Sequence, residues 1–258
     1  MLNIIVCYKW VLDEQEIRVN AGSMTLDTGR AAYKISDYDR NAVEEAVLLA
    51  ERYGASVCGL TYGGDPVKQS LKDALSRGLD SVYWVHDPSA ATADAFVTAN
   101  ILAAAIRKIG KYDLILCGEG ASDTYAQQVA PRLAALVDIP GLTFVSKLAV
   151  EDNKAVATRK LGDCTEVCTV PFPAVVSVLP EINQPRIPSL KQVLGAAKKP
   201  MIEWRASDLE LSSAEITPKV RVASLKGYAM SRKNMIFKEE AAASVTKLVA
   251  SLAKEGVL

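Results

Sequence analysis

The stretch KYDLILCGEGASDTYAQQVAP, residues 111–131, joins a short apolar run to a loop of small and polar residues. Residues 114–117 are all apolar, as expected of a buried strand, and Gly118 and Gly120 follow directly. In a parallel α/β sheet, such a loop leads from a strand into the N-terminus of a helix, where anions bind. The stretch therefore predicts a strand, a glycine-rich loop and a helix, with a ligand site between them.

The same alternation of strand and helix extends toward the N-terminus. Short apolar runs predict strands, and apolar residues at helical spacing that end at a glycine predict helices. The predicted strands are 4–7, 56–61, 82–85 and 114–117, and the predicted helices are 39–53, 66–77 and 92–109. This order is typical of a mainly parallel sheet with helices on both faces. The predicted fold class is α/β.

The second half of the chain has a different pattern. Runs at 144–158 and 166–170 predict strands of a β excursion, and the apolar segment 173–179 predicts a buried strand that returns to the main sheet. The final helix is predicted at 238–254, after a polar stretch without periodicity. We expect a nucleotide-binding body over 1–180, with the excursion at about 142–172, and a docking loop and C-terminal arm over 181–258.

Composition excludes several classes of protein. Lys plus Arg and Asp plus Glu are 30 each, so no net charge attracts nucleic acid or an anionic membrane. No apolar run reaches the ~20 residues of a membrane span, and the N-terminus lacks the features of a signal peptide. The five cysteines, an odd and scattered set, favour reduced thiols in a cytoplasmic protein.

The loop after residue 117 has polar groups suited to a phosphate but lacks those for phosphoryl transfer. Ser122, Asp123 and Thr124 offer hydroxyls and a helix cap, and Gln127 and Gln128 offer amide donors. A P-loop would place a lysine here, and none is present. The loop predicts a nucleotide that is held as a structural or redox cofactor rather than cleaved. A plain helix cap is the alternative, and Pro131 is expected to kink or restart the helix.

The sequence offers no catalytic residues of its own. His86 is the one histidine, and it is expected in a loop at the end of a strand. Cys164 and Cys168 would lie about 13 Å apart in a strand, which favours small buried side chains over zinc ligands. No metal site and no triad of catalytic residues is predicted.

Five segments resemble the electron transfer flavoprotein β-subunit family, and specifically its Fix-type branch. The resemblance covers essentially the first 205 residues. It is carried by VCYKWVLDEQEIRV (6–19), KISDYDRNAVEEA (34–46), LSRGLDS (75–81), ILCGEGASDTYAQQVAP (115–131) and PAVVSVLPEINQPRIPSLKQVLGAAKKP (173–200). One departure is Ser36-Asp37, where many relatives have Asn-Pro, so contacts to adenine or ribose are in question there.

The resemblance implies an adenine-nucleotide pocket in the α/β body. The implied cofactor-binding residues are Cys7, Ser36, Asp37, Tyr38, Asp39, Tyr62, Gly63, Gly118, Gly120, Ala121, Ser122, Asp123, Thr124, Tyr125, Ala126, Gln127, Gln128 and Val129. The nucleotide is AMP in simple members of the family and a second FAD in bifurcating members. The Tyr62-Gly63-Gly64 turn leaves backbone room, which favours the larger ligand.

The resemblance also implies partners. The chain would form a heterodimer with an α-subunit that carries another FAD, and it would move electrons between an acyl-CoA dehydrogenase-type or other redox partner and an acceptor. Bifurcation with NADH stays open. The implied docking residues are Ile182, at an apolar tip, with Asn183, Pro185 and Arg186.

Two other functions stay open at this point. A nucleotide-binding regulatory module without a redox role would share the α/β body. A nucleotide-cleaving enzyme is disfavoured because the loop has no lysine. The last helix either folds back on its own body or packs against the α-subunit, and the family's heterodimer favours the second arrangement.

Overall fold

The structure is a computed structural model that describes residues 2–228 and 232–258. These residues divide into two units. The larger unit comprises Met1–Arg18 and Asp27–Ser224, and the smaller comprises Val19–Leu26 and Leu225–Leu258. No helix in the described part of the chain is long and apolar enough to cross a membrane.

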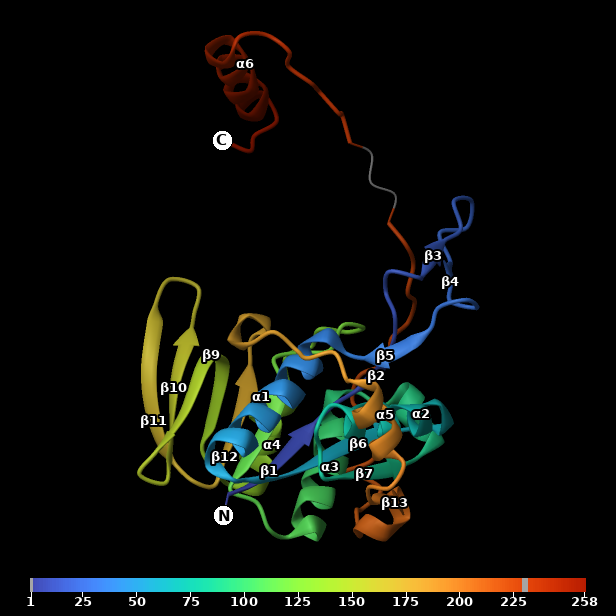
Figure 1. Ribbon diagram of the computed structural model, residues 1–258. Coiled ribbons are helices and arrows are strands. Elements are labelled where there is room, and N and C mark those ends of the chain that lie inside the picture. Colours follow the sequence, from blue (N-terminus) through green and yellow to red (C-terminus); the bar gives the residue numbers. More distant parts are fainter. Residues whose placement is uncertain (1, 229–231) are drawn as a thin grey trace. The chain divides into compact units, whose positions relative to one another are not determined.

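Among the described residues, one nine-stranded sheet forms the centre of the larger unit (Figure 1). Its strands, in spatial order, are β11 (Thr165–Pro171), β10 (Lys154–Lys160), β9 (Gly141–Glu151), β12 (Ala174–Val178), β8 (Leu114–Gly118), β1 (Asn3–Cys7), β6 (Ser56–Gly63), β7 (Ser81–His86) and β13 (Met201–Arg205). Neighbours from β9 to β13 pair in parallel, and β10 pairs antiparallel with β9 and β11. The predicted mainly parallel sheet is confirmed.

Helices cover both faces of this sheet, as predicted. Side chains of β1 alternate between two cores, with Ile4 and Val6 in one and Ile5 and Cys7 in the other. The first core also includes apolar residues of α1 (Asp37–Tyr53) and α2 (Lys68–Ser76). The second includes those of α3 (Ala95–Ile109) and α4 (Val129–Val137). The apolar side chains on each face of the sheet are thus buried by a pair of helices.

Shorter elements position the ends of the strands. The antiparallel pair of β2 (Trp10–Leu12) and β5 (Tyr33–Ile35) brings the start of α1 next to the end of β1. Two further short strands, β3 (Arg18–Val19) and β4 (Leu26–Asp27), form a second ribbon. The other elements of the larger unit are the helix α5 (Leu190–Ala196) and four 3₁₀ turns. These turns are η1 (Asp65–Val67), η2 (Pro88–Thr92), η3 (Pro180–Ile182) and η4 (Ala206–Leu209).

Two sequence predictions about strands were wrong or incomplete. The single strand predicted at 144–158 is two strands, because Asp152 and Asn153 form a tight turn with φ of 46° and 60°. Positive φ at both central residues is the signature of a hairpin turn. The edge strand β13 was not predicted, because its five residues lie in a polar stretch without periodicity.

The smaller unit contains the last helix, α6 (Ala241–Lys254), close to its predicted bounds. None of its residues is buried. The apolar residues of its predicted stripe are 59% exposed at Val245, 45% at Leu248 and 49% at Val249. A 14-residue helix is marginal in water without tertiary packing. Burial of these exposed side chains against another surface would therefore stabilise it.

Candidate functional site

The buried carboxylate of Asp39 joins the ends of β1 and β8. It accepts hydrogen bonds from the backbone N–H of Lys9 (2.8 Å) and of Gly118 (3.2 Å). Gly118 has room for no side chain, because a Cβ there would lie 2.7 Å from Oδ1 of Asp39 and 2.8 Å from the carbonyl carbon of Tyr38. The first turn of α1 is therefore fixed directly against the strand ends.

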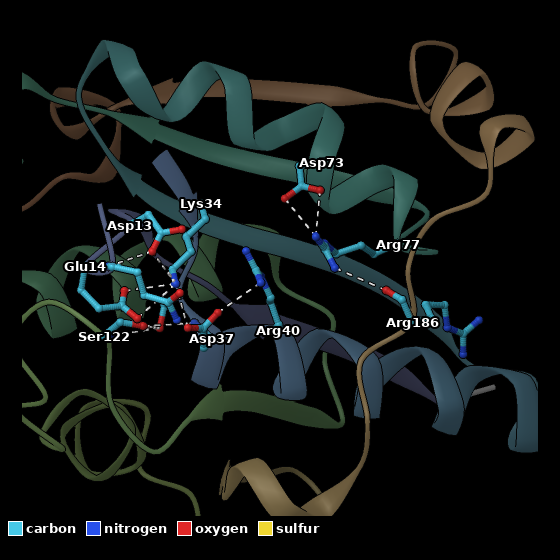
Figure 2. A network of polar contacts seen from close by, with 11 residues as sticks. Asp13, Glu14, Lys34, Asp37, Arg40, Asp73, Arg77, Ser122 and Arg186 are labelled. Carbon is cyan, nitrogen blue, oxygen red and sulfur yellow. Dashed lines mark hydrogen bonds and ion pairs between the residues drawn. The ribbon is translucent and has the colours of Figure 1, made fainter. Parts of the chain in front are cut away.

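Ser36 and Ser122 fasten the loop after β8 to the N-terminus of α1. The Ser122 N–H donates to Oγ of Ser36 (3.2 Å), and the Asp37 N–H donates to Oγ of Ser122 (3.1 Å), a contact drawn in Figure 2. Ser36 is completely buried and precedes α1 without capping it through its side chain. Two of the segments implied by the resemblance, 36–39 and 118–129, thus lie side by side.

Lys9, which follows the first strand, is a further charged residue beside the implied cofactor-binding residues. Its ammonium group lies 2.5 Å from Oδ2 of Asp123, and both side chains are partly exposed. The position directly after strand 4–7 was the available sequence signal, because strand ends meet at one edge of a parallel sheet. Lys9 thus joins the end of β1 to the glycine-rich loop through an ion pair.

The loop leads into α4 through an unusual backbone. Tyr125 and Gln127 have φ of 44° and 55°, in the left-handed region that favours glycine. Gln128 then returns to the right-handed region and gives α4 no side-chain cap. The first N–H groups of a helix have no partner inside it, and alternating left- and right-handed residues turn successive N–H groups toward one point. The start of α4 thus lacks a side-chain cap, and an anion could be bound there by its first N–H groups.

Of the two effects predicted for Pro131, a kink and a restart of the helix, the kink is absent. The helix begins at Val129, so Pro131 lies in its first turn. A proline costs little there, since its missing N–H would have no partner inside the helix. The loop 118–128 is correspondingly longer than the sequence predicted, and Gln127 and Gln128 belong to it rather than to the helix interior.

Tyr125 packs over this loop from its exposed side. Its ring lies 5.0 Å from that of Tyr38, and its hydroxyl donates to Oε1 of Glu119 at 2.8 Å. Its backbone N–H donates to the carbonyl of Ala121. Thr124 and Ala126 are exposed beside it. Tyr125 therefore fixes the loop through its contacts to Tyr38 in α1 and to Glu119 and Ala121 within the loop.

Cys7, Tyr62 and Gly63 lie at the same sheet edge, at the ends of β1 and β6. Cys7 is buried, and its hydrogen bond to Cys117 together with burial raises the pKa of its thiol, so it is a small packing residue. The Tyr62 hydroxyl is buried, and Ser89 is the side chain that interacts with it. Burial raises the pKa of Tyr62, so this hydroxyl is a protonated donor.

The comparison with protein families matches this architecture. Residues 23–209 match the model of the electron transfer flavoprotein domain. The chain belongs to the electron transfer flavoprotein family. Proteins of this family generally bind flavin and transfer electrons. The matched region includes both joined segments of the site and the residues 182–186, whereas Cys7 and α6 lie outside it.

In this electron transfer flavoprotein, the expected docking residues are largely held by α1. The Asn183 amide donates to the carbonyl of Asn41 and to Oε2 of Glu45, each at 3.0 Å. Arg186 binds Glu44 through two of its nitrogens and also pairs with Glu51. These contacts fix the course of the chain over α1.

The expected apolar tip lies elsewhere than Ile182. Ile182 is half-buried and packs against the first core, and Pro185 is also half-buried. The strongly exposed apolar side chains follow it, at Ile187 (93%), Leu190 (74%) and Leu194 (66%). Leu190 and Leu194 are one turn apart on α5, whose N-terminus is capped by Ser189 in a capping box with Gln192.

The stability of this electron transfer flavoprotein is expected to fall as pH rises from about 4 to about 7, because of Asp39. Burial raises the pKa of Asp39 from its ordinary 3.8 to about 7, against the two N–H groups that lower it. A group whose pKa is raised by folding stabilises the fold fully below its ordinary pKa and loses that contribution as pH reaches the folded value. Three pKa units correspond to an upper limit of about 4 kcal/mol.

Urea unfolding across this pH range, without nucleotide, measures the effect. Asp39→Asn removes the titrating group, so the part of the decrease in the free energy of unfolding that is due to Asp39 should be absent from the variant. An equal decrease in both proteins would show that Asp39 is not its source.

Proposed function

We propose that the chain is the β-subunit of a heterodimeric electron transfer flavoprotein of the Fix-type branch, and that its 118–129 loop holds an adenosine 5′-phosphate group. The observation that carries this proposal is the uncapped N-terminus of α4 at the carboxyl edge of the sheet. Helix N-termini at this edge are the usual phosphate sites of α/β proteins. The body over 1–180 is the nucleotide-binding part in this proposal.

The residues present fit such a nucleotide. The backbone N–H groups of Gln128, Val129 and Ala130, at the start of α4, would bind the phosphate together with the positive end of the helix dipole. The buried Tyr62 hydroxyl would be one further donor. The left-handed residues Tyr125 and Gln127 carry a backbone cost of about 1–3 kcal/mol each, which is a common feature of ligand-binding loops.

The proposal stops at the adenosine phosphate, which AMP and FAD share. The glycine at Gly63 does not favour the larger ligand, because a Cβ there would lie 2.4 Å from Cγ2 of Val67. Packing within the protein thus explains this glycine without a ligand. FAD in the pocket would make bifurcation with NADH the function to test, and AMP would make the protein a simple electron carrier.

The electron-carrying step belongs to flavin, which accepts and releases electrons when bound. In this proposal the chain's own residues bind and orient the nucleotide. Within the described residues no group of three or more His, Cys, Asp or Glu is arranged for a metal ion. His86 instead pairs with Asp65 and Glu203, at 2.9 and 3.1 Å.

We also propose that the segment after η3 recognises the redox partner. Asn183 and Arg186 would hold this segment on α1 through the contacts described above, while Ile187, Leu190 and Leu194 present apolar side chains to a dehydrogenase or other electron donor. Exposed apolar anchors beside polar residues are common centres of protein interfaces.

Leu190→Ala is expected to weaken binding of the redox partner roughly thirtyfold, because loss of a buried interface anchor costs about 2 kcal/mol. Flavin content should be unchanged, since Leu190 lies on α5, which packs against α2. The measurement is the partner-concentration dependence of electron transfer. Val167→Ala, an equally exposed apolar residue on β11, is the matched control. Unchanged kinetics of the Leu190 variant would remove this surface from the proposal.

Co-expression with an α-subunit tests the proposed function as a whole. The chain should co-purify with the α-subunit as a yellow complex that accepts electrons from a dehydrogenase. A chain that binds nucleotide but forms no flavin-containing complex would instead be a regulatory module.

A further inference from the structure

A pocket of about 380 Å³ lies between α1, α2 and the residues 185–188. Its walls are Asp37, Arg40 and Asn41 from α1, Arg77 after α2, and the segment 185–188. Asp37 also belongs to the candidate nucleotide site, where its N–H donates to Ser122. The other lining residues lie outside the segments 36–39 and 118–129. The volume falls within the ~300–1,000 Å³ of small-molecule sites.

The charges on the pocket walls favour an anion. Arg40, Arg77 and Arg186 line it, and Asp37 is the one carboxylate among the lining residues. The first turns of α1 also form part of the wall, and the positive end of a helix dipole adds to the potential there. The other carboxylates that pair with these arginines stand outside the pocket.

Arg186 lines the pocket with its guanidinium group and its backbone, but most of its N–H donors already have partners. Its nitrogens are taken up by Glu44 and Glu51, in five contacts of 2.6–3.1 Å. Its carbonyl accepts a long hydrogen bond from Nη1 of Arg77, at 3.5 Å. Arg186 therefore fixes the position of Arg77 and closes one wall.

Arg40 and Arg77 have unused donors and no shared counter-ion. Each pairs with a carboxylate of its own helix or turn, Arg40 with Asp37 and Arg77 with Asp73, both at 3.1 Å. The Nε–H groups of both are buried without a hydrogen-bond partner among the described residues. Figure 2 shows the two guanidinium groups extending from α1 and α2 into the same gap. Two like charges that face one pocket are stabilised by an anion between them.

We propose that the pocket between Arg40 and Arg77 binds a phosphate group, either as the free anion or as the end of a small phosphate ester. A planar carboxylate is satisfied by the fork of a single arginine. Two arginines on opposite walls instead suit a tetrahedral group, whose oxygens point in several directions. Pro185, Ile187 and Pro188 supply an apolar wall for an organic part of the ligand.

The test is a titration of the full chain, with the arginine Nε–H groups observed by NMR. Inorganic phosphate and glycerol 3-phosphate are added separately at constant ionic strength, with acetate as the planar anion. The Nε–H signals of Arg40 and Arg77 should shift to saturation with at least one phosphate compound and not with acetate. Arg52, at the other end of α1, should not respond.

Substitutions make the result decisive. Arg77→Gln should weaken phosphate binding at least tenfold, and Arg52→Gln should leave it unchanged. If Arg77→Gln fails to fold, Arg40→Gln, which alters a more exposed arginine, provides the same comparison. Tighter binding of glycerol 3-phosphate would identify an ester as the ligand, and tighter binding of inorganic phosphate would identify the free anion. Shifts without saturation, equal shifts with acetate or at Arg52, or full affinity in both pocket variants would overturn the proposal.

Discussion

Deleting residues 237–258 is expected to abolish co-purification of the chain with the proposed α-subunit and to remove the flavin from the preparation. The deleted segment contains α6, whose apolar stripe at Val245, Leu248 and Val249 is about half exposed. With Leu252, four side chains of this kind contribute ~1.5–3 kcal/mol each when buried, before the cost of ordering the helix. Such a loss is large enough to dissociate a heterodimer.

A triple substitution separates the stripe from the rest of the arm. Serine at Val245, Leu248 and Val249 should reproduce the deletion, whereas Lys247→Ala on the polar side should not. Size-exclusion chromatography with absorbance at flavin wavelengths measures both outcomes. A truncated chain that still forms a stable yellow complex would mean that α6 is not the contact that holds the subunits together.

Gly120→Val is expected to eliminate the nucleotide held by this chain. A Cβ at Gly120 would lie 2.8 Å from Cδ2 and 3.2 Å from Cε2 of Tyr125, so the ring must move. Tyr125 is tied to Glu119 and Tyr38 and has a left-handed backbone, so its displacement disturbs the whole loop. The new side chain would also cover backbone that a phosphate must approach.

The matched control for this substitution is Gly162→Val, where a Cβ meets no atom within 4 Å and no left-handed φ is required. Both variants are denatured after purification, and the nucleotide released per chain is determined by chromatography. Retention of nucleotide by the Gly120 variant, at the level of the control, would show that the loop is not the binding site.

The main sheet could be predicted from the sequence because most of its parallel strands are short apolar runs that alternate with helices. Runs such as 114–117 are buried on both faces and carry their own signal. The edge strand β13 carries only a weak signal, because its alternation of exposed and half-buried residues extends over five residues and its strand conformation depends on pairing with β7. The turn at Asp152 and Asn153 was visible in principle, since both residue types tolerate positive φ.

The candidate site was predictable in part. The loop 118–129 followed from the strand that precedes it, whereas the segment 36–39 came from family resemblance alone. The bonds that join them depend on pairs far apart in the chain, such as Asp39 with Gly118 and Ser36 with Ser122. No local pattern contains such pairs. The same holds for Arg40 and Arg77, whose pocket exists because α1 and α2 lie against the same segment.

The central claim is that this chain holds its own adenine nucleotide, and its most direct test is the nucleotide content of the purified heterodimer. Acid denaturation should release one equivalent of AMP or FAD per chain in addition to the FAD of the α-subunit. A preparation that contains one FAD per heterodimer, and no AMP, would contradict the account.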